Sequence, residues 1–258
     1  MAGKKKEWAK VWSQTQIADD VFDLWLETDL AKEAKAGQFV GVYTLDRSML
    51  LPRPISICEV DREAGRLRLV YRVVGGGTKE FSHDKTGKRM EILGTLGNGF
   101  PLEEGRGKRA LLMGGGIGIP PMLQLAKDLE GEKNIVLGYR NEQLFLKDEI
   151  SRYGTVAVAT EDGSRGTKGN VLDAVREQNI KADIIYACGP LPMLRAIKQY
   201  AEKEGIPAYI SLEERMACGV GACLGCVCKT HHKDHHSHVN NARICTDGPV
   251  FYAEDVDI

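Results

Sequence analysis

The sequence lacks a long hydrophobic run and has no excess of charge of either sign. No apolar stretch approaches the length of a membrane span, and the basic start MAGKKKEWAK has no apolar segment behind it, as a secretory signal would. The 35 Lys and Arg residues nearly balance the 36 Asp and Glu residues, which gives no electrostatic reason to expect a nucleic acid or an anionic membrane as partner. We therefore expect a cytoplasmic protein that binds neither.

Catalytic constellations and paired cysteines are also missing. No Ser/His/Asp arrangement and no pair of carboxylates stands out, so we predict no catalytic acid, base or nucleophile. The seven cysteines are odd in number, and five of them fall between residues 218 and 245. Clustering of this kind without a secretory signal indicates metal chemistry in a reducing compartment rather than disulfide bonds.

Four of these cysteines have the spacing of an iron–sulfur site. Cys218, Cys223, Cys226 and Cys245 form the pattern C-x4-C-x2-C…C, which is typical of the plant-type [2Fe–2S] cluster. The residues between the first three are mostly glycine and alanine, which let the backbone turn inward and point its N–H groups at sulfur. The sequence therefore predicts these four cysteines as the ligands of a [2Fe–2S] cluster.

A structural zinc site is the alternative, because four thiolates also bind zinc. Zinc sites usually come as two C-x2-C pairs, and here only Cys223 and Cys226 form one. Cys228 lies outside the pattern and is interpreted as a neighbour of the cluster. The tract 231–238 holds five of the six histidines, a composition found in zinc or nickel sites. A solvated loop insertion is the simpler interpretation, because composition alone does not fix ligand geometry.

Residues up to about 100 are predicted to form a small antiparallel β-barrel. Short runs rich in β-branched and aromatic residues, with partial alternation of apolar and polar positions, are separated by turn residues such as Gly65 and Gly87. These runs cover residues 21–26, 38–44, 54–58, 66–74 and 89–93. Five or six strands at this spacing favour a barrel.

Two motifs in the predicted barrel have the chemistry of a phosphate-binding site. In the run RPIS at 53–56, the Arg53 guanidinium can bind a phosphate through two hydrogen bonds, and the Ser56 hydroxyl can bond a ring nitrogen. In GGGT at 75–78, a glycine turn is expected to open a short helix with Thr78 as its N-cap, where N–H groups would bind a pyrophosphate. Each motif alone occurs often by chance, but both on one barrel strengthen the interpretation.

The pattern changes after residues 105–108, which marks a second domain. A buried strand at 109–113 leads into a glycine-rich turn and a helix at 122–129 behind Pro120 and Pro121, which is half of a βαβ unit. Further strands are predicted at 134–139, 155–160 and 183–187, with helices at 171–177, capped by Asn170, and at 191–203, ending at Gly205. Alternating strands and helices predict a parallel sheet, which binds ligands at the carboxyl ends of its strands.

Two turns fall at those strand ends. The first contains Gly114, Gly115, Gly116 and Gly118, and the second contains Cys188 and Gly189. The first turn is not the usual G-x-G-x-x-G, and no acidic residue is clearly placed for a ribose hydroxyl. Cys188 also has an alternative interpretation as a small buried apolar residue.

The expected fold class is thus multidomain, β and α/β. An antiparallel β-barrel domain is predicted at 1–104, a Rossmann-like parallel α/β nucleotide-binding domain at 105–209, and a small C-terminal [2Fe–2S] domain at 210–258.

With these parts in order, the chain resembles the ferredoxin-reductase-like flavoproteins over nearly its whole length. The resemblance rests on RPIS at 53–56, GGGT at 75–78, LGNGF at 96–100, GGGIGIPP at 114–121 and ACGP at 187–190, and most specifically on EERMACGVGACLGC at 213–226 and CTDGPVF at 245–251. Within this group it is most similar to the electron-transfer subunits of NAD-dependent (type B) dihydroorotate dehydrogenases. Similar subunits of sulfide dehydrogenases and transhydrogenases typically have an aspartate in place of Cys218. The His-rich stretch before Cys245 is longer than this family usually has.

The resemblance implies FAD on the barrel, NAD+ as substrate on the α/β domain, and electron transfer as the role of this chain. It implies that Arg53, Pro54, Ile55 and Ser56 contact the flavin or its pyrophosphate, that Val70, Tyr71 and Arg72 line the FAD, that Gly77 and Thr78 hold the pyrophosphate, and that Gly114, Gly115, Gly116, Gly118, Cys188 and Gly189 frame the NAD site. It further implies a partner, an FMN-containing catalytic subunit that oxidises dihydroorotate in pyrimidine synthesis, in a heterotetramer of two plus two. Electrons would pass from that FMN through the cluster and FAD to NAD+.

Two other functions fit parts of the sequence. A stand-alone NAD(P)H reductase serving a ferredoxin or sulfur acceptor would work without an FMN partner. A regulatory or binding module, with a redox-sensing cluster or a zinc scaffold, would leave the RPIS and GGGT motifs without a role and would carry no flavin.

Overall fold

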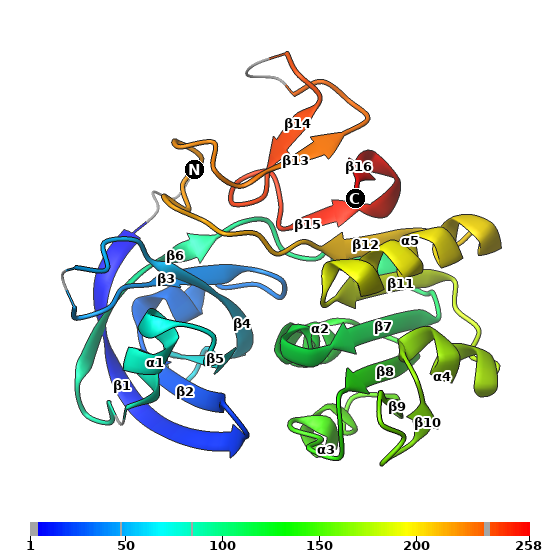
Figure 1. Ribbon diagram of the computed structural model, residues 1–258, viewed down its shortest axis with the longest axis horizontal. Coiled ribbons are helices and arrows are strands. Elements are labelled where there is room, and N and C mark those ends of the chain that lie inside the picture. Colours follow the sequence, from blue (N-terminus) through cyan, green and yellow to red (C-terminus); the bar gives the residue numbers. More distant parts are fainter. Residues whose placement is uncertain (1–4, 47, 84, 235–237) are drawn as a thin grey trace.

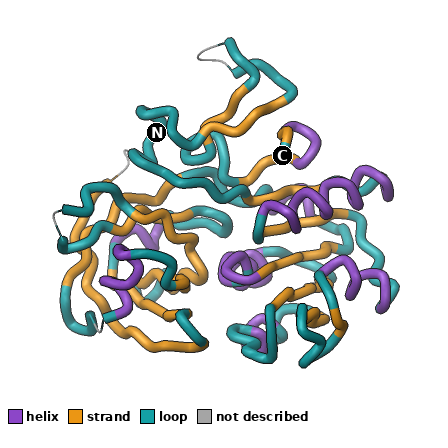
Figure 2. Tube along the Cα trace, in the orientation of Figure 1, coloured by secondary structure: helices purple, strands orange, loops and turns teal. Residues whose placement is uncertain are grey.

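The computed structural model describes residues 5–46, 48–83, 85–234 and 238–258. Figure 1 shows a barrel built by the first hundred residues, an α/β part beside it, and a small β-rich part that lies across the top of both. Figure 2 shows strands concentrated in the barrel, while most of the helices lie around the sheet of the α/β part. None of the helices in the described ranges combines the length and the apolar character needed to cross a bilayer.

Six antiparallel strands close the barrel in the order β1-β2-β5-β4-β3-β6. They are β1 (Lys5–Ala18), β2 (Val21–Glu27), β3 (Phe39–Val42), β4 (Arg53–Asp61), β5 (Arg66–Arg72) and β6 (Arg89–Leu96), with helix α1 (Gly76–Ser82) after β5. Alternate residues such as Leu24, Leu67 and Leu69 are buried in the interior. The predicted runs account for β2 to β6.

Strand β1 is the one barrel strand that the predicted runs do not include. It closes the barrel by pairing with both β2 and β6. Its register shifts between Val11 and Ser13 and between Gln16 and Ala18, and such bulges bend a strand. Its inward residues include Ala9 and Val11, while the outer face carries the exposed Trp8 and Trp12 among charged and polar residues. Apolar residues on both faces leave no clear alternation, which is the signal that marked the other strands.

A doubly wound sheet forms the second part, in the order β10-β9-β8-β7-β11-β12-β15. Its strands are β7 (Ala110–Gly115), β8 (Lys133–Tyr139), β9 (Thr155–Thr160), β10 (Thr167–Lys168), β11 (Ile184–Cys188), β12 (Ala208–Ser211) and β15 (Val250–Tyr252). Its helices are α2 (Pro120–Asp128), α3 (Lys147–Ile150), α4 (Val171–Glu177) and α5 (Leu191–Glu204). Every pairing is parallel except that of β12 with β15. The chain order reverses between β7 and β11, which is where sheets of this type bind ligands.

Alternating side chains of β7 pack on opposite faces of this sheet. Leu111 and Met113 join the apolar cluster that includes α4 and α5, whereas Leu112 joins the cluster that includes α2. The predicted helix ends are confirmed: the Asn170 side chain caps α4, and Gly205 ends α5 at a φ of 65°.

The third part is a small sheet in the order β14-β13-β16. It contains β13 (Val227–Thr230), β14 (Asn241–Arg243) and β16 (Val256–Asp257). Short 3-10 helices lie at Asp29–Lys32, Leu102–Gly105, Gly116–Gly118 and Ala253–Asp255. The predicted boundary at 209/210 falls within β12, and β15 extends the α/β sheet from a later segment of the chain.

Helix α2 and the guanidinium of Arg68 join the barrel to the α/β part. Gln124 of α2 accepts a hydrogen bond from the Val60 N–H of β4 (2.7 Å). Arg68 of β5 is only 6% exposed and donates to Asp23, to Glu59 and, across the junction, to Glu149 of α3. A buried arginine with three carboxylates fixes the orientation of the two parts, because each group would be costly to leave unpaired.

Candidate cluster and cofactor sites

The four predicted cluster ligands lie on two neighbouring segments of the third part. Cys218, Cys223 and Cys226 follow one another on the loop before β13, and Cys245 follows β14. The Ile244 N–H donates to the carbonyl of Cys226 (2.8 Å), which holds the two segments together. Cys226 and Cys245 are buried, whereas Cys223 is exposed. The thiols therefore gather in one region that has a buried side and an open side.

Backbone N–H groups of this loop point at the sulfur atoms, as the sequence predicts. The N–H groups of Val220 and Ala222 donate to Cys218 Sγ at 3.4 and 3.3 Å, and that of Gly225 donates to Cys223 Sγ at 3.4 Å. Burial alone raises the pKa of the Cys218 thiol, but these amides and the neighbouring Cys223 lower it to about 6. Such donors stabilise a thiolate, which is the form that binds metal.

The donor set and the backbone both fit a [2Fe–2S] cluster, in which each iron binds two thiolates. Gly219 and Gly221 have φ angles of 68° and 82°, so the loop curls inward without a Cβ in the way. Over the described ranges, no three His, Cys, Asp or Glu side chains gather around one point as the ligands of a single ion do. A [2Fe–2S] cluster does not require such a group, because each iron takes only two thiolates and sulfides bridge the two irons.

The other metal-binding candidates lie outside this set. Burial raises the pKa of the half-buried Cys228 thiol to about 11, and the nearby Cys226 adds to the shift. In the tract 231–238, His232 Nε2 lies 3.4 Å from Asp255 Oδ1. His235 and His236 lie outside the described residues, so the interpretation of the tract as a loop insertion stays a prediction.

The two barrel motifs predicted to bind phosphate lie side by side. Arg53 begins β4, and its guanidinium packs so closely on Gly77 of α1 that a Cβ on that glycine would overlap Nε. The Arg53 Nη1 donates to the carbonyls of Leu51 and Met49 in the β3–β4 loop. The rest of the first motif follows on β4 and is half-buried: Pro54, Ile55 and Ser56. A cation therefore stands against the first turn of α1.

The structure corrects the predicted role of Thr78 in this helix. Helix α1 begins at Gly76 with Gly75 as its N-cap, so Thr78 is the third helical residue and not the cap. The Thr78 hydroxyl accepts hydrogen bonds from the N–H groups of Val74 (2.9 Å) and Gly75 (3.2 Å). The prediction was wrong because glycine also caps helices, and a hydroxyl at the third position can reach back to satisfy the turn.

The segment predicted to line the FAD presents one long side chain outward. Tyr71 points into the barrel, where its ring stacks on Phe22 at 5.8 Å and meets Phe81 edge-on at 6.1 Å. Val70 is buried in the apolar cluster at the junction with the α/β part. Arg72 is half-buried, and its side chain forms no hydrogen bond or ion pair with any described residue. Of the three, Arg72 alone has a side chain available to an anion.

The glycine-rich turns at the ends of β7 and β11 touch one another. Gly114 pairs with Cys188 across these strands, and a Cβ on Gly118 would overlap the Cys188 carbonyl oxygen. A Cβ on Gly115 or on Gly189 would overlap the side chain of Met193. Gly116, in the first of these turns between Gly115 and Gly118, has a φ of 55° and open space around it. The predicted residues of the NAD site are thus brought together, and each close approach requires glycine.

Cys188 has the burial that its alternative interpretation predicts. Its side chain is buried, and burial raises the pKa of the thiol, with a further contribution from Glu213. The surrounding protein also raises the pKa of the Glu213 carboxyl, although part of that side chain is open to solvent. Sequence reasoning missed both Glu213 and Met193 as neighbours of these turns, because they come from other elements: Met193 lies in α5 and Glu213 in the segment after β12.

Asn98, in the turn after β6, joins the barrel to the cluster-bearing part. Its side-chain amide donates to the carbonyls of Thr246 (3.2 Å) and Asp247 (3.0 Å), and its N–H donates to the carbonyl of Gly248 (2.6 Å). A Cβ on Gly97 would overlap Pro249 Cδ. The sequence had marked the LGNGF stretch as part of the resemblance without assigning it a role.

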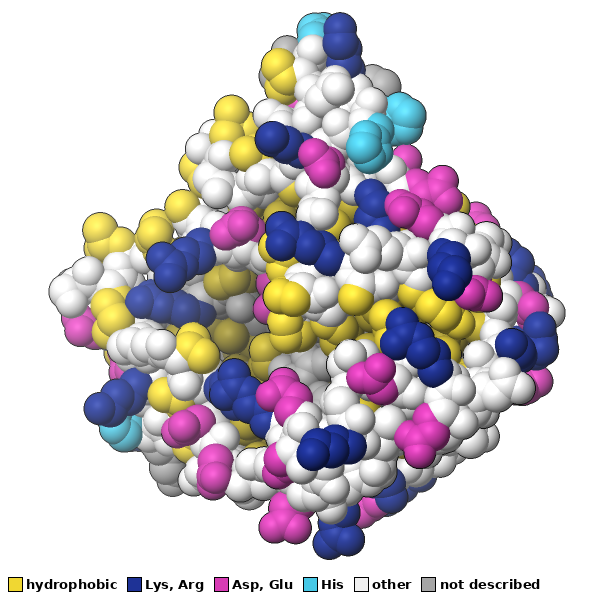
Figure 3. All heavy atoms as spheres, turned by 45° about the vertical axis from the view of Figure 1, so that its right-hand side comes forward, with side chains coloured by type: hydrophobic (Ala, Val, Ile, Leu, Met, Phe, Trp, Pro, Cys, Tyr) yellow, Lys and Arg dark blue, Asp and Glu magenta, His cyan; other side chains and the backbone are white. Residues whose placement is uncertain are grey.

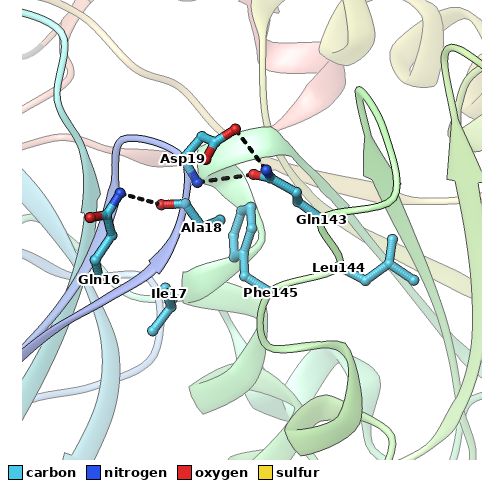
Figure 4. A pocket seen from close by; sticks show the side chains of 7 residues that line it. All are labelled: Gln16, Ile17, Ala18, Asp19, Gln143, Leu144 and Phe145. Carbon is cyan, nitrogen blue, oxygen red and sulfur yellow. Dashed lines mark hydrogen bonds between the residues drawn. The ribbon is translucent and has the colours of Figure 1, made fainter.

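A pocket of about 500 Å³ lies at another point of the barrel–α/β junction. Residues 16–19 and 143–145 line it, and Figure 4 shows Asp19 and Gln143 joined across it by two hydrogen bonds of 2.9 and 2.7 Å. It contains none of the predicted site residues. Figure 3 shows a hollow between the barrel side and the α/β side, with apolar side chains in it and Lys and Arg along the barrel rim.

Comparison with known proteins identifies two of the three parts. Residues 213–257 match the iron-sulfur cluster binding domain of dihydroorotate dehydrogenase B, and residues 112–199 match the oxidoreductase NAD-binding domain. The chain is 44% identical to the dihydroorotate dehydrogenase B (NAD(+)) electron transfer subunit of Geobacillus sp. (strain WCH70), over 98% of each chain. It is also 44% identical to the subunit of that name from Streptococcus mutans, over 95% of this chain and 96% of the relative.

Solved structures confirm the predicted fold class. A chain of an NADH-dependent reduced ferredoxin-NADP oxidoreductase is similar to this protein with a TM-score of 0.84 and 29% identity, covering 100% of this chain and 91% of that chain. A ferredoxin NADP+ reductase from Neisseria gonorrhoeae with bound FAD and NADP has a TM-score of 0.65 at 15% identity, over 82% of this chain and 94% of that chain. The second likeness shows the fold alone.

Proposed function

Because this chain belongs to the family of dihydroorotate dehydrogenase B (NAD(+)) electron transfer subunits, we propose that it carries electrons from a catalytic partner subunit to NAD+. The route runs through a [2Fe–2S] cluster and an FAD held by this chain. The partner oxidises dihydroorotate, a step of pyrimidine synthesis, and this chain contributes electron transfer only. Accordingly, no acid, base or nucleophile is assigned to it.

The observation that carries the proposal is the position of the four thiols. The turn that follows Cys245 is hydrogen-bonded to the barrel through Asn98, and the segment that carries the other three cysteines follows β12 of the sheet. A one-electron carrier placed against both nucleotide-binding parts has the position that a conduit requires. FAD, when bound, supplies the link between one-electron and two-electron chemistry.

Each part of the chain has a proposed ligand. Cys218, Cys223, Cys226 and Cys245 would hold the cluster, with the N–H groups of their loop aimed at sulfur. On the barrel, FAD would be bound by Arg53, Pro54, Ile55, Ser56, Val70, Tyr71, Arg72, Gly77 and Thr78. On the sheet, NAD+ would be bound by Gly114, Gly115, Gly116, Gly118, Cys188 and Gly189.

The chemistry of the binding residues differs between the two nucleotide sites. Arg53 and Arg72 are the cations that would neutralise the FAD pyrophosphate, since Arg53 lies on Gly77 and Arg72 has no other partner among the described residues. Tyr71 and Val70 would contribute through the backbone, because protein covers their side chains. At the NAD site, the turns supply close backbone approach at the sheet's switch point.

We further propose the arrangement of the complex and its compartment. The partner would carry FMN, and two copies of each subunit would form a heterotetramer. The three functional units would be residues 1–104 for FAD, 105–209 for NAD and 210–258 for the cluster. A cluster of free thiols that serves a metal centre supports a cytoplasmic location.

One structural relative favours a second candidate. The NADH-dependent reduced ferredoxin-NADP oxidoreductase covers all of this chain, so a reductase that serves a ferredoxin without an FMN partner would use the same parts. That function predicts turnover by the isolated chain with NADH and a ferredoxin at a rate that the FMN subunit does not increase.

The test is the anaerobically purified chain, studied by visible spectroscopy and by EPR before and after NADH. We expect flavin absorbance and a reduced [2Fe–2S] signal that NADH produces. Adding the FMN subunit and dihydroorotate with NAD+ should then produce NADH. A flavin-free protein that contains zinc would refute the conduit and favour a regulatory module, whereas an NADH-reducible cluster without dihydroorotate-driven NADH formation would favour the ferredoxin reductase.

A further inference from the structure

An Arg–Asp ion pair closes the turn that carries Cys245. The carbonyl of Arg243 accepts hydrogen bonds from the N–H groups of Thr246, Asp247 and Gly248 at 3.1, 2.8 and 3.3 Å. The Asp247 carboxylate in return accepts from the N–H, Nε and Nη2 of Arg243 at 2.7, 3.1 and 3.1 Å. This bidentate pairing of guanidinium and carboxylate holds one positive and one negative charge at fixed positions beside a cluster ligand.

Arg243 also reaches the other segment that supplies thiols. Its Nη1 donates to the carbonyl of Gly221 at 3.4 Å, and Gly221 lies between Cys218 and Cys223. The two segments are in close contact here, because a Cβ on Gly221 would lie 2.8 Å from Thr246 Cγ2 and 3.4 Å from Arg243 Nη1. The guanidinium therefore lies where the two ligand-bearing segments meet.

The charges of this pair are partly shielded from solvent. The side chain of Arg243 is 18% exposed and that of Asp247 is 35% exposed. Water and salt screen such charges less than those on an open surface, so each acts more strongly on a neighbouring redox centre. Reduction adds one electron to a cluster, and the potential of a cluster depends on net charge and on hydrogen bonds to its sulfurs. A nearby cation favours the reduced state, and a nearby anion favours the oxidised state.

We propose that Arg243 and Asp247 are positioning residues that set the reduction potential of the [2Fe–2S] cluster through opposed charges. Arg243 raises the potential and ties the Gly221 loop to the turn of Cys245. Asp247 holds the guanidinium in place and offsets part of its charge. This role rests on the proposed function, because it requires that the four cysteines bind the cluster. It adds the two residues that set the reduction potential of that cluster.

The experiment is an EPR-monitored redox titration of the cluster-loaded chain with Arg243→Gln and Asp247→Asn. At the wild-type midpoint, we expect the ratio of reduced to oxidised cluster to fall about tenfold in Arg243→Gln, a shift of about 59 mV for one electron. We expect it to rise by a similar factor in Asp247→Asn. The double variant should return to within about threefold of the wild type, because both charges are then gone.

A charge effect predicts these opposite signs, whereas a purely structural role predicts that both single variants disturb the cluster in the same way. Arg243→Lys keeps the charge and should keep a cluster near the wild-type potential. Shifts of the same sign, no shift in either single variant, or loss of the cluster from both Arg243→Gln and Arg243→Lys would overturn the proposal.

The matched control is Arg109→Gln. Arg109 forms the same three-bond pairing with Asp183, through its N–H, Nε and Nη2 at 2.9, 3.0 and 2.7 Å, at the start of β7 and away from the cluster loop. The Arg109→Gln variant should leave the reduction potential of the cluster unchanged. Mediators set the potential in this titration, so its result does not depend on NADH or on the partner subunit. Failure of the proposed electron route and failure of this inference therefore give different observations.

Discussion

Asn98 offers a direct test of how the cluster-bearing part is held against the barrel. Replacing Asn98 by alanine removes two side-chain hydrogen bonds, to the carbonyls of Thr246 and Asp247 at 3.2 and 3.0 Å. A hydrogen bond contributes about 0.5–1.5 kcal/mol net, so the pair is worth about 1–3 kcal/mol. Because Asn98 is exposed, the lower end of this range applies. The undocked population, in which the turn after Cys245 has separated from the barrel, should then grow about fivefold.

The undocked state is expected to remain a minority in Asn98→Ala. The Asn98 N–H still donates to the carbonyl of Gly248 at 2.6 Å, and Gly97 still packs on Pro249. The cluster should therefore be bound at wild-type occupancy. Amide hydrogen exchange over residues 243–249 should become about fivefold faster, because exchange follows the undocked population. NADH-driven bleaching of the cluster in a stopped-flow instrument should slow by less than about twofold, because most molecules stay docked. NADH oxidation by ferricyanide, which needs FAD and not the cluster, should be unchanged.

Gln143→Ala is the matched control for this prediction. Its side-chain amide bridges the barrel and the α/β part, accepting from the Asp19 N–H at 2.9 Å and donating to the Asp19 carboxylate at 2.7 Å. It should leave exchange over 243–249 and cluster reduction as they are in the wild type. Unchanged exchange in Asn98→Ala, or an equal effect in Gln143→Ala, would show that Asn98 does not hold the two parts together.

The remaining predictions concern the cluster, the NAD site and stability. Cys223→Ser should leave FAD bound and stop electron flow from the partner; unimpaired dihydroorotate-driven NADH formation would defeat it. Gly118→Ala should raise the KM for NADH at least several-fold while flavin absorbance persists, since its Cβ would overlap a carbonyl at the end of β11; an unchanged KM counts against the NAD site. Arg68→Met should cost about 3–5 kcal/mol by leaving Asp23 and Glu149 without their cation, while Glu59 keeps Lys127, and a melting temperature within a degree of wild type would contradict it. In the cluster-free chain, alkylation of Cys218 should follow the thiolate and rise through pH 6, since the pKa is lowered to about 6 and the thiolate forms above it; a midpoint near that of an ordinary thiol would refute the role of the N–H donors.

Local signals in the sequence were reliable where neighbouring residues decide the structure. Asn170 and Gly205 mark the ends of two helices, because a cap depends on the residues of one turn. The same kind of signal misplaced the start of α1, because Gly75 and Thr78 are both able to satisfy a helix terminus and the sequence does not choose between them. Strand β1 was not among the named runs, because its apolar residues lie on both of its faces and give no clear alternation of apolar and polar positions.

Burial decided which members of a motif present their side chains. The family resemblance implied that Val70, Tyr71 and Arg72 line the FAD, and the fold turns Tyr71 into the barrel and Val70 into the domain junction. Arg72 remains half-buried with its charge unmatched by any described residue. Successive side chains of a β-strand point to opposite faces of the sheet, and the sequence shows this alternation. Only the closed barrel and the packed α/β part determine which of these faces are covered.

The sequence by itself determined the cluster ligands as candidates, the order of the parts and the family resemblance. These depend on spacing and residue type along the chain, as in the four cysteines between 218 and 245. Only the tertiary structure decided how the parts meet. Asn98 reaches Thr246 across 148 residues, and Arg243 reaches back to Gly221 across 22. Such contacts result from the packing of a barrel, a sheet and a loop against one another, and no local pattern encodes which distant residue will be the partner.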